Sequence, residues 1–164
     1  MQLRATLKYS EPLVRRAVLS YWRRSLGWGI LGAVAFTNAM FIWRIVEGDR
    51  SWFVGLLAAF GLFGIVMPVA VYLAHYRNSL GKFREMKNPE ATFVADEASF
   101  TLTSDVGSST LRWSSIVEVW RFDTFWLLLF SKAQFATVPL QDVPEQMLSY
   151  ILERVRGAGG KIAV

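Results

Sequence analysis

The side chains that could perform chemistry are few and scattered in this sequence. His75 is the single histidine, and the 164 residues include no cysteine. One histidine without thiol or acidic neighbours provides neither a metal site nor a general base held by an orienting partner. Asp96 and Glu97 are adjacent, but they fall between two expected strands, where acids serve as turn residues. We therefore expect no catalytic residue, no metal site and no cofactor, and we expect that the protein is not an enzyme.

The glycine-rich segment near the C-terminus has the composition of a phosphate-binding loop but not its spacing. It reads Gly157-Ala158-Gly159-Gly160-Lys161. The motif needs a glycine five residues before Gly160, and Val155 occupies that position. It also needs a serine or threonine after the lysine, where Ile162 stands. The segment is therefore predicted to be a frayed tail.

Two long apolar stretches determine where the other parts of the chain lie. They cover residues 26–46 and 52–74, and the polar segment Glu47–Ser51 separates them. A helix needs about 20 apolar residues to cross the hydrocarbon core of a bilayer, and each stretch meets that length. The apolar share of 53% and the mean hydropathy of +0.30 agree with this interpretation. The sequence predicts a transmembrane helical hairpin over residues 26–74.

The positive charge of the chain is concentrated beside the two stretches. The chain has a net charge of +5, and residues 1–25 alone carry +5. Residues 75–90 carry +2, whereas residues 91–164 carry −2. Lys and Arg that flank a membrane helix are retained on the cytoplasmic side. We therefore expect a multi-pass protein of the inner (plasma) membrane with both termini in the cytoplasm, and no binding to nucleic acid.

Residues 1–25 are expected to form a strand and then a basic amphipathic helix. Polar and apolar residues alternate from Gln2 to Lys8, which is typical of a half-buried strand that must join a sheet. Ser10 is the expected N-cap of the helix. Four basic residues of the helix could contact anionic lipid: Arg15, Arg16, Arg23 and Arg24. The alternative is that the apolar side of the helix packs on the soluble domain and the arginines only set its orientation, and the sequence leaves both open.

Residues 75–90 are expected to form a basic helical connector, and residues 91–164 a small antiparallel β-domain in the cytoplasm. The second region consists of short runs of β-branched and aromatic residues separated by turn residues. Phe125–Phe130 is apolar on both faces and is expected to be a central strand. Asp142 is the expected N-cap of a last helix, with Glu145 as its capping-box acid. The apolar stripe of that helix should close the sheet: Val143, Met147, Tyr150, Ile151 and Val155.

Three short motifs accompany this order of parts. They are Leu7-Lys8-Tyr9-Ser10-Glu11, Arg112-Trp113-Ser114-Ser115-Ile116 and Val138-Pro139-Leu140. With them the chain resembles the YcxB-like family of bacterial membrane proteins, whose members often have a basic residue where Leu140 stands. The resemblance implies an α+β fold in which a two-helix transmembrane hairpin is joined to a small antiparallel β-barrel or sandwich. That domain would be similar to bacterial pleckstrin-homology-like (PH-like) domains and closed by a C-terminal helix. The resemblance implies no catalytic residues.

The absence of reactive groups favours a membrane-anchored binding or scaffolding module. The hairpin would tether the β-domain, and Trp120, Phe122 and Trp126 would offer a protein or peptide partner an aromatic surface, unless all three belong to the core. One alternative is an oligomeric pore of hairpins, because Thr37 and Asn38 lie mid-span, although bonds between helices would satisfy both. Small residues at four-residue spacing would allow close packing within the hairpin or between copies: Gly29 with Ala33, Ala35 with Ala39 and Gly55 with Ala59. A second alternative is an enzyme with an unrecognised site.

Overall fold

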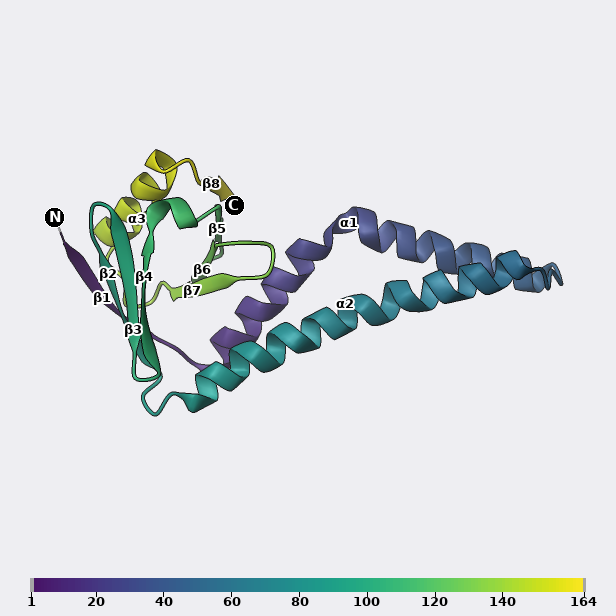
Figure 1. Ribbon diagram of the computed structural model, residues 1–164, viewed down its shortest axis with the longest axis horizontal. Coiled ribbons are helices and arrows are strands. Elements are labelled where there is room, and N and C mark those ends of the chain that lie inside the picture. Colours follow the sequence, from purple (N-terminus) through teal and green to yellow (C-terminus); the bar gives the residue numbers. More distant parts are fainter. Residues whose placement is uncertain (1, 164) are drawn as a thin grey trace. The chain divides into compact units, whose positions relative to one another are not determined.

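The computed structural model describes residues 2–163, which divide into two compact units (Figure 1). The sheet unit comprises residues 2–17 and 78–163, and the hairpin unit comprises residues 18–77. Segments that precede and follow the hairpin unit in the sequence therefore fold together. The elements follow one another in the order β1 (Leu3–Lys8), α1 (Glu11–Val46), α2 (Trp52–Glu85), β2 (Glu90–Ala95), β3 (Ser99–Ser104), β4 (Gly107–Arg112), the 3-10 turn η1 (Trp113–Ser115), β5 (Glu118–Arg121), β6 (Phe125–Leu129), β7 (Phe135–Pro139), α3 (Glu145–Gly157) and β8 (Lys161–Ala163).

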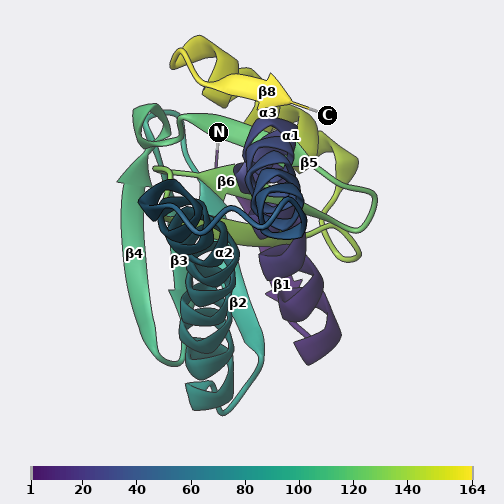
Figure 2. The same ribbon diagram turned by 90° about the vertical axis from the view of Figure 1, so that its right-hand side faces the viewer.

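The first sheet is antiparallel, with the strand order β1-β2-β3-β4 (Figure 2). β1 pairs with β2 along its whole length. Ala5 and Leu7 are buried, whereas Arg4, Thr6 and Lys8 are exposed, so the alternation in the sequence matches the two faces of the strand. The prediction that this segment joins a sheet is confirmed, and its partner strand β2 follows the hairpin in the sequence.

The second sheet has the order β7-β6-β5-β8, and β8 runs parallel to β5. β6 is an interior strand in which every residue is buried, as its apolar sequence predicts. The prediction of a frayed C-terminal tail is wrong, because residues 161–163 form β8. The backbone of Gly160 passes so close to the sheet that a Cβ there would lie 2.7 Å from the Ile116 carbonyl oxygen. Glycine therefore lets the chain return beside β5, and the Lys161 amide donates to the Val117 carbonyl at 3.0 Å.

One hydrophobic core is shared by both sheets and α3. Phe93 and Phe100 of the first sheet stack with ring centroids 5.5 Å apart, and both are fully buried. The predicted stripe of α3 contributes Met147, Ile151 and Val155, all buried. The described strands form two four-stranded sheets that are not closed into a barrel. The fold is therefore a mixed α+β arrangement of two sheets around a common core.

The start of α3 differs from the prediction. The helix begins at Glu145, and Pro144 occupies the N-cap position without any side-chain hydrogen bond. The Pro144 carbonyl instead accepts from the Met147 amide at 2.9 Å. Asp142 lies too early to cap this helix, and its carboxylate is 3.6 Å from the Lys8 ammonium. The proline, with its φ of −59°, leads directly into the first turn, so no capping box forms.

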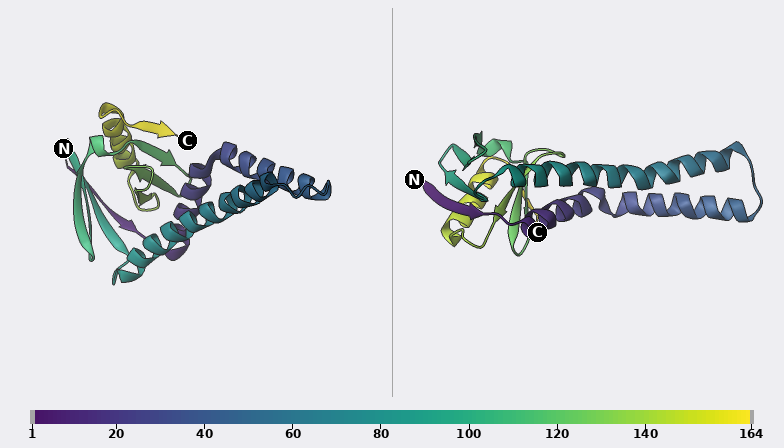
Figure 3. Two further views of the ribbon diagram at one scale, coloured as in Figure 1. Left: turned by 45° about the vertical axis from the view of Figure 1, so that its right-hand side comes forward. Right: turned by 90° about the horizontal axis from the view of Figure 1, so that it is seen from below.

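In the hairpin unit, α1 and α2 run antiparallel and side by side (Figures 1 and 3). Ser10 caps α1 as predicted, since its hydroxyl accepts from the Leu13 amide at 3.4 Å. α1 is interrupted at Gly27, whose φ of 63° is left-handed, between its basic first part and its apolar second part. α1 ends at Val46, and Gly48 follows with a φ of 78°. Both helices are long and apolar enough to cross a membrane.

The two helices approach each other through glycines of α2. A Cβ on Gly61 would lie 2.9 Å from the Asn38 amide oxygen, and one on Gly64 would lie 2.8 Å from a Val34 methyl group. The predicted bonds between helices do not form, because Thr37 and Asn38 donate to carbonyls of their own helix, four residues earlier. Packing within the hairpin therefore does not use Gly29 or Gly55, since a Cβ added to either would meet no atom within 4 Å. Packing between copies stays a prediction.

Candidate functional site

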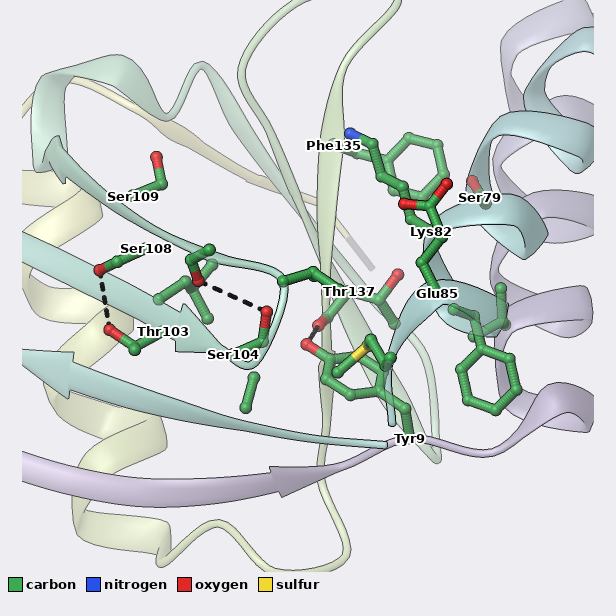
Figure 4. A pocket seen from close by; sticks show the side chains of 17 residues that line it. Tyr9, Ser79, Lys82, Glu85, Thr103, Ser104, Ser108, Ser109, Phe135 and Thr137 are labelled. Carbon is green, nitrogen blue, oxygen red and sulfur yellow. Dashed lines mark hydrogen bonds between the residues drawn. The ribbon is translucent and has the colours of Figure 1, made fainter. Parts of the chain in front are cut away.

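A pocket of about 530 Å³ lies in the sheet unit (Figure 4). Its walls come from the residue after β1, the beginning of α1, the last turns of α2, the β3–β4 hairpin and β7. Pockets that hold small molecules measure about 300–1,000 Å³. Hydroxyl groups and apolar side chains line this one, together with a single cation, Lys82, and a single acid, Glu85.

The last turns of α2 provide one wall of the pocket. Ser79, Lys82 and Phe83 lie at positions i, i+3 and i+4 of the helix, and Met86 follows at i+7. Residues with this spacing share one face of a helix. The helix is unbroken from Trp52 to Glu85, so the second apolar stretch continues directly into the pocket wall. This wall therefore presents polar and apolar groups within a few residues of each other.

Tyr9 joins the two sheets at the base of the pocket. Its amide donates to the Pro89 carbonyl at 2.8 Å, and its hydroxyl donates to the Thr137 carbonyl of β7 at 2.9 Å (Figure 4). Burial raises the pKa of the Tyr9 hydroxyl, because the phenolate would lose its hydration. The phenol therefore stays protonated and acts as a hydrogen-bond donor, not as a base.

The β3–β4 hairpin lines the opposite wall with hydroxyl groups. The hydroxyls of Thr103 and Ser108 are 2.8 Å apart and bond to each other (Figure 4). At the tip, one carboxylate oxygen of Asp105 accepts from the amides of Lys87 and Asn88, at 2.6 and 3.0 Å. These two bonds hold the hairpin against the loop that follows α2. Polar contacts therefore fix the position of the hairpin beside the pocket.

The side chains that line the pocket are suited to binding a small molecule. The lining includes no histidine or cysteine. Within residues 2–163 no group of three or more His, Cys, Asp or Glu side chains could hold a metal ion. The lining offers one positive and one negative charge, several hydroxyls and an apolar surface. Such a set can orient a small molecule that has both polar and apolar parts.

Residues 95–152 match the model of a protein family described as YcxB-like protein. The predicted resemblance to the YcxB-like family is confirmed. No curated protein and no solved structure matches the chain. The YcxB-like region supplies the β3–β4 hairpin and β7 to the pocket, whereas Tyr9 and the wall from α2 lie outside it. The pocket is therefore assembled from the YcxB-like region and from segments that precede it.

His75 and the four arginines that were singled out from the sequence lie outside the pocket lining. His75 is in the hairpin unit, where its ring meets that of Tyr21 edge-on at 5.2 Å. Of the four arginines proposed to contact lipid, three are exposed and Arg24 is half-buried, and Arg15 forms an ion pair with Glu11. None of these residues lines the pocket.

The aromatic residues of the YcxB-like region are mostly buried. Trp126 is 5% exposed and belongs to the core, so the interpretation as a core residue is confirmed for it. Trp120 is 7% exposed. Phe122 is half-buried and its ring lies 4.9 Å from that of Phe125. These three side chains therefore do not present a continuous aromatic surface.

The sequence contains one local signal for the pocket, which the predictions above did not include. Ser79, Lys82, Phe83 and Met86 form a mixed stripe at helical spacing, immediately after a stretch long enough to cross a membrane. The contribution of Tyr9 could not be predicted, because its partner Thr137 is 128 residues away in the sequence.

Proposed function

We propose that the protein is a membrane-anchored binding module whose sheet unit binds a small molecule in the pocket beside Tyr9. The hairpin would cross the inner membrane twice, with both termini and the sheet unit in the cytoplasm. The observation that carries this proposal is the continuity of α2, which leads from an apolar stretch into the wall of a pocket of ligand size.

The exposure of apolar side chains in the hairpin unit supports membrane insertion. Trp28 is 90% exposed, Phe36 68% and Phe60 61%. In water each such side chain would forgo the free energy that burial provides, about 1.5–3 kcal/mol for a large apolar residue. A bilayer supplies an apolar environment along both helices. The concentration of Lys and Arg in residues 1–25 and 75–90 supports the proposed orientation.

The fold of the YcxB-like region supports a relation to PH-like domains. Two sheets share a core that α3 helps to fill, as expected of a small sandwich with a C-terminal helix. Fold alone does not determine function, so the proposal rests on the pocket. The exposed arginines of α1 would add contacts with anionic lipid.

Native mass spectrometry of the full chain released from membranes tests this function. Ser79→Trp places a bulky side chain in the pocket, while Asn78→Trp, at the neighbouring position outside the lining, is the matched control. We expect a bound small molecule in the wild type and in Asn78→Trp, and its loss in Ser79→Trp. A wild type without any bound molecule, or equal occupancy in all three proteins, would contradict the proposal.

A further inference from the structure

The two charged groups of the pocket lie together at one end of it. Figure 4 shows Lys82 and Glu85 extending from α2 on the side of Phe135, whereas Ser108 and Ser109 lie at the far end, on the β3–β4 hairpin. Lys82 is the only cation of the lining and Glu85 the only acid. A ligand that meets both residues must therefore carry a negative and a positive charge close together.

The protein itself leaves both charges available. Within the part of the chain that the structure describes, neither Lys82 nor Glu85 forms an ion pair. Residues three apart on a helix are neighbours, but a pair in which the lysine precedes the acid has the less favourable order. Both side chains are exposed. Their charged ends can therefore bind a molecule that enters the pocket.

These two groups suit a free amino acid. An ammonium group donates charge-assisted hydrogen bonds to a carboxylate, so Lys82 fits the carboxylate of such a ligand and Glu85 fits its ammonium group. One carbon atom separates the two charged groups of an α-amino acid, so both can meet side chains that are neighbours on one helix. In a longer peptide the same two charges lie at opposite ends of the chain.

The apolar side chains of the lining indicate what the rest of the ligand is. Phe135 lies beside Lys82 at the charged end (Figure 4), and Met86 is half-buried on the same wall as Lys82. Aromatic rings attract other rings, and a methionine sulfur makes favourable contacts with them. The Tyr9 ring adds apolar surface at the base of the pocket, where its hydroxyl is already bonded to Thr137. An aromatic side chain would therefore meet complementary surface.

We propose that the pocket binds a free amino acid with an aromatic side chain. Lys82 would hold its carboxylate and Glu85 its ammonium group, with the ring against the apolar side chains of the lining. This inference rests on the proposed function and adds the chemical class of the ligand.

Isothermal titration calorimetry of the full chain in detergent, with L-phenylalanine as the probe, tests the inference. Lys82→Met and Glu85→Gln each remove one charge from the lining, and Arg84→Met removes a charge from the same helix end outside the lining. All three side chains are exposed, so without the probe the variants should melt like the wild type. We expect the dissociation constant to rise about tenfold in the first two variants, the effect of losing about 1.4 kcal/mol of binding free energy. It should stay unchanged in Arg84→Met.

Two analogues of phenylalanine separate the roles of the two charges. 3-Phenylpropionate lacks the ammonium group and phenethylamine lacks the carboxylate, so each should bind the wild type about tenfold more weakly than phenylalanine. In Lys82→Met, phenethylamine should bind as tightly as phenylalanine, because the carboxylate has lost its partner. In Glu85→Gln, 3-phenylpropionate should do so for the corresponding reason.

Several results would overturn the inference. They are no binding of phenylalanine to the wild type, equal affinity of the wild type for phenylalanine and either analogue, and equal affinity of all variants for phenylalanine. Glycine has both charges but no side chain, and binding of glycine as tight as that of phenylalanine would overturn the aromatic assignment. If native mass spectrometry showed a bound molecule that Ser79→Trp displaces and that is not an amino acid, the binding function would stand and only the ligand assignment would fail.

Discussion

Two tyrosines of the sheet unit differ in what their hydroxyl groups contact. The Tyr9 hydroxyl donates to the Thr137 carbonyl at 2.9 Å. The Tyr150 hydroxyl is buried and has no hydrogen-bond partner among residues 2–163, although its ring packs edge-on against Trp113 and under the Arg154 guanidinium. A buried hydroxyl without a partner costs free energy, whereas a satisfied one contributes to stability. The same substitution at these two positions therefore compares a satisfied hydroxyl with an unsatisfied one.

At these positions, replacement by phenylalanine should have opposite effects. Tyr9→Phe removes a hydrogen bond and leaves the Thr137 carbonyl unpaired, so the free energy of unfolding should fall by about 1 kcal/mol. Tyr150→Phe removes only an unsatisfied group, so stability should be unchanged or slightly higher. Denaturant unfolding of the full chain in detergent measures both. A loss of stability in Tyr150→Phe as large as that in Tyr9→Phe would contradict the assignment of these contacts.

The glycines of α2 differ in whether they contact α1. Gly64 lies against Val34 of α1, and Gly55 has open space around it. Alanine at position 64 would place its Cβ 2.8 Å from a Val34 methyl group, and the branched valine has little freedom to move away. Gly64→Ala should therefore destabilise the helix pair by about 1–3 kcal/mol. Gly55→Ala should be neutral or stabilising, because alanine favours a helix by about 1 kcal/mol.

Thermal unfolding in detergent, followed by circular dichroism, compares these two variants. A melting temperature that falls in Gly64→Ala and not in Gly55→Ala agrees with the observed helix contact. If Gly55→Ala were the less stable variant, the helices would pack through the stripe that the sequence suggested first.

Most elements could be predicted from the sequence because their patterns are local. The strand over residues 2–8, the Ser10 cap, the apolar strand β6 and the stripe of α3 all follow from the spacing of residues close together in the chain. The two wrong predictions have different reasons. In one, another residue occupies the expected position, and in the other, the strand pairs with a segment far away in the sequence. Pro144 took the cap position that Asp142 was expected to hold, and β8 depends on pairing with β5, more than 40 residues earlier.

For the whole molecule, the decisive feature is that the chain completes its sheet unit from both sides of the hairpin. Leu7 of β1 is 1% exposed and lies in the same core as Phe93 and Ile151. Leu7→Ala should lower the free energy of unfolding by about 2–5 kcal/mol, because it leaves a cavity. Thr6→Ala, on the exposed face of the same strand, should change it little. Equal effects of the two substitutions in chemical unfolding would show that β1 adds nothing to the core.

The pocket also depends on the folding of the whole chain, and that is why the sequence did not reveal it. Its lining comes from segments between Tyr9 and Thr137 that only the three-dimensional fold brings together. The stripe on α2 was the single local signal. The expectation that the chain has no catalytic set does not locate a binding site.

The central claim is that the hairpin crosses a membrane and leaves both flanking segments on one side. The sequence has no cysteine, so single cysteines can be introduced at three exposed positions: Gln2, Ser51 and Gln141. A membrane-impermeant thiol reagent should label Ser51→Cys in intact cells stripped of any outer membrane. It should label Gln2→Cys and Gln141→Cys only after the cells are permeabilised. Labelling of Gln141→Cys but not Ser51→Cys in intact cells, or of all three only after permeabilisation, would contradict the account.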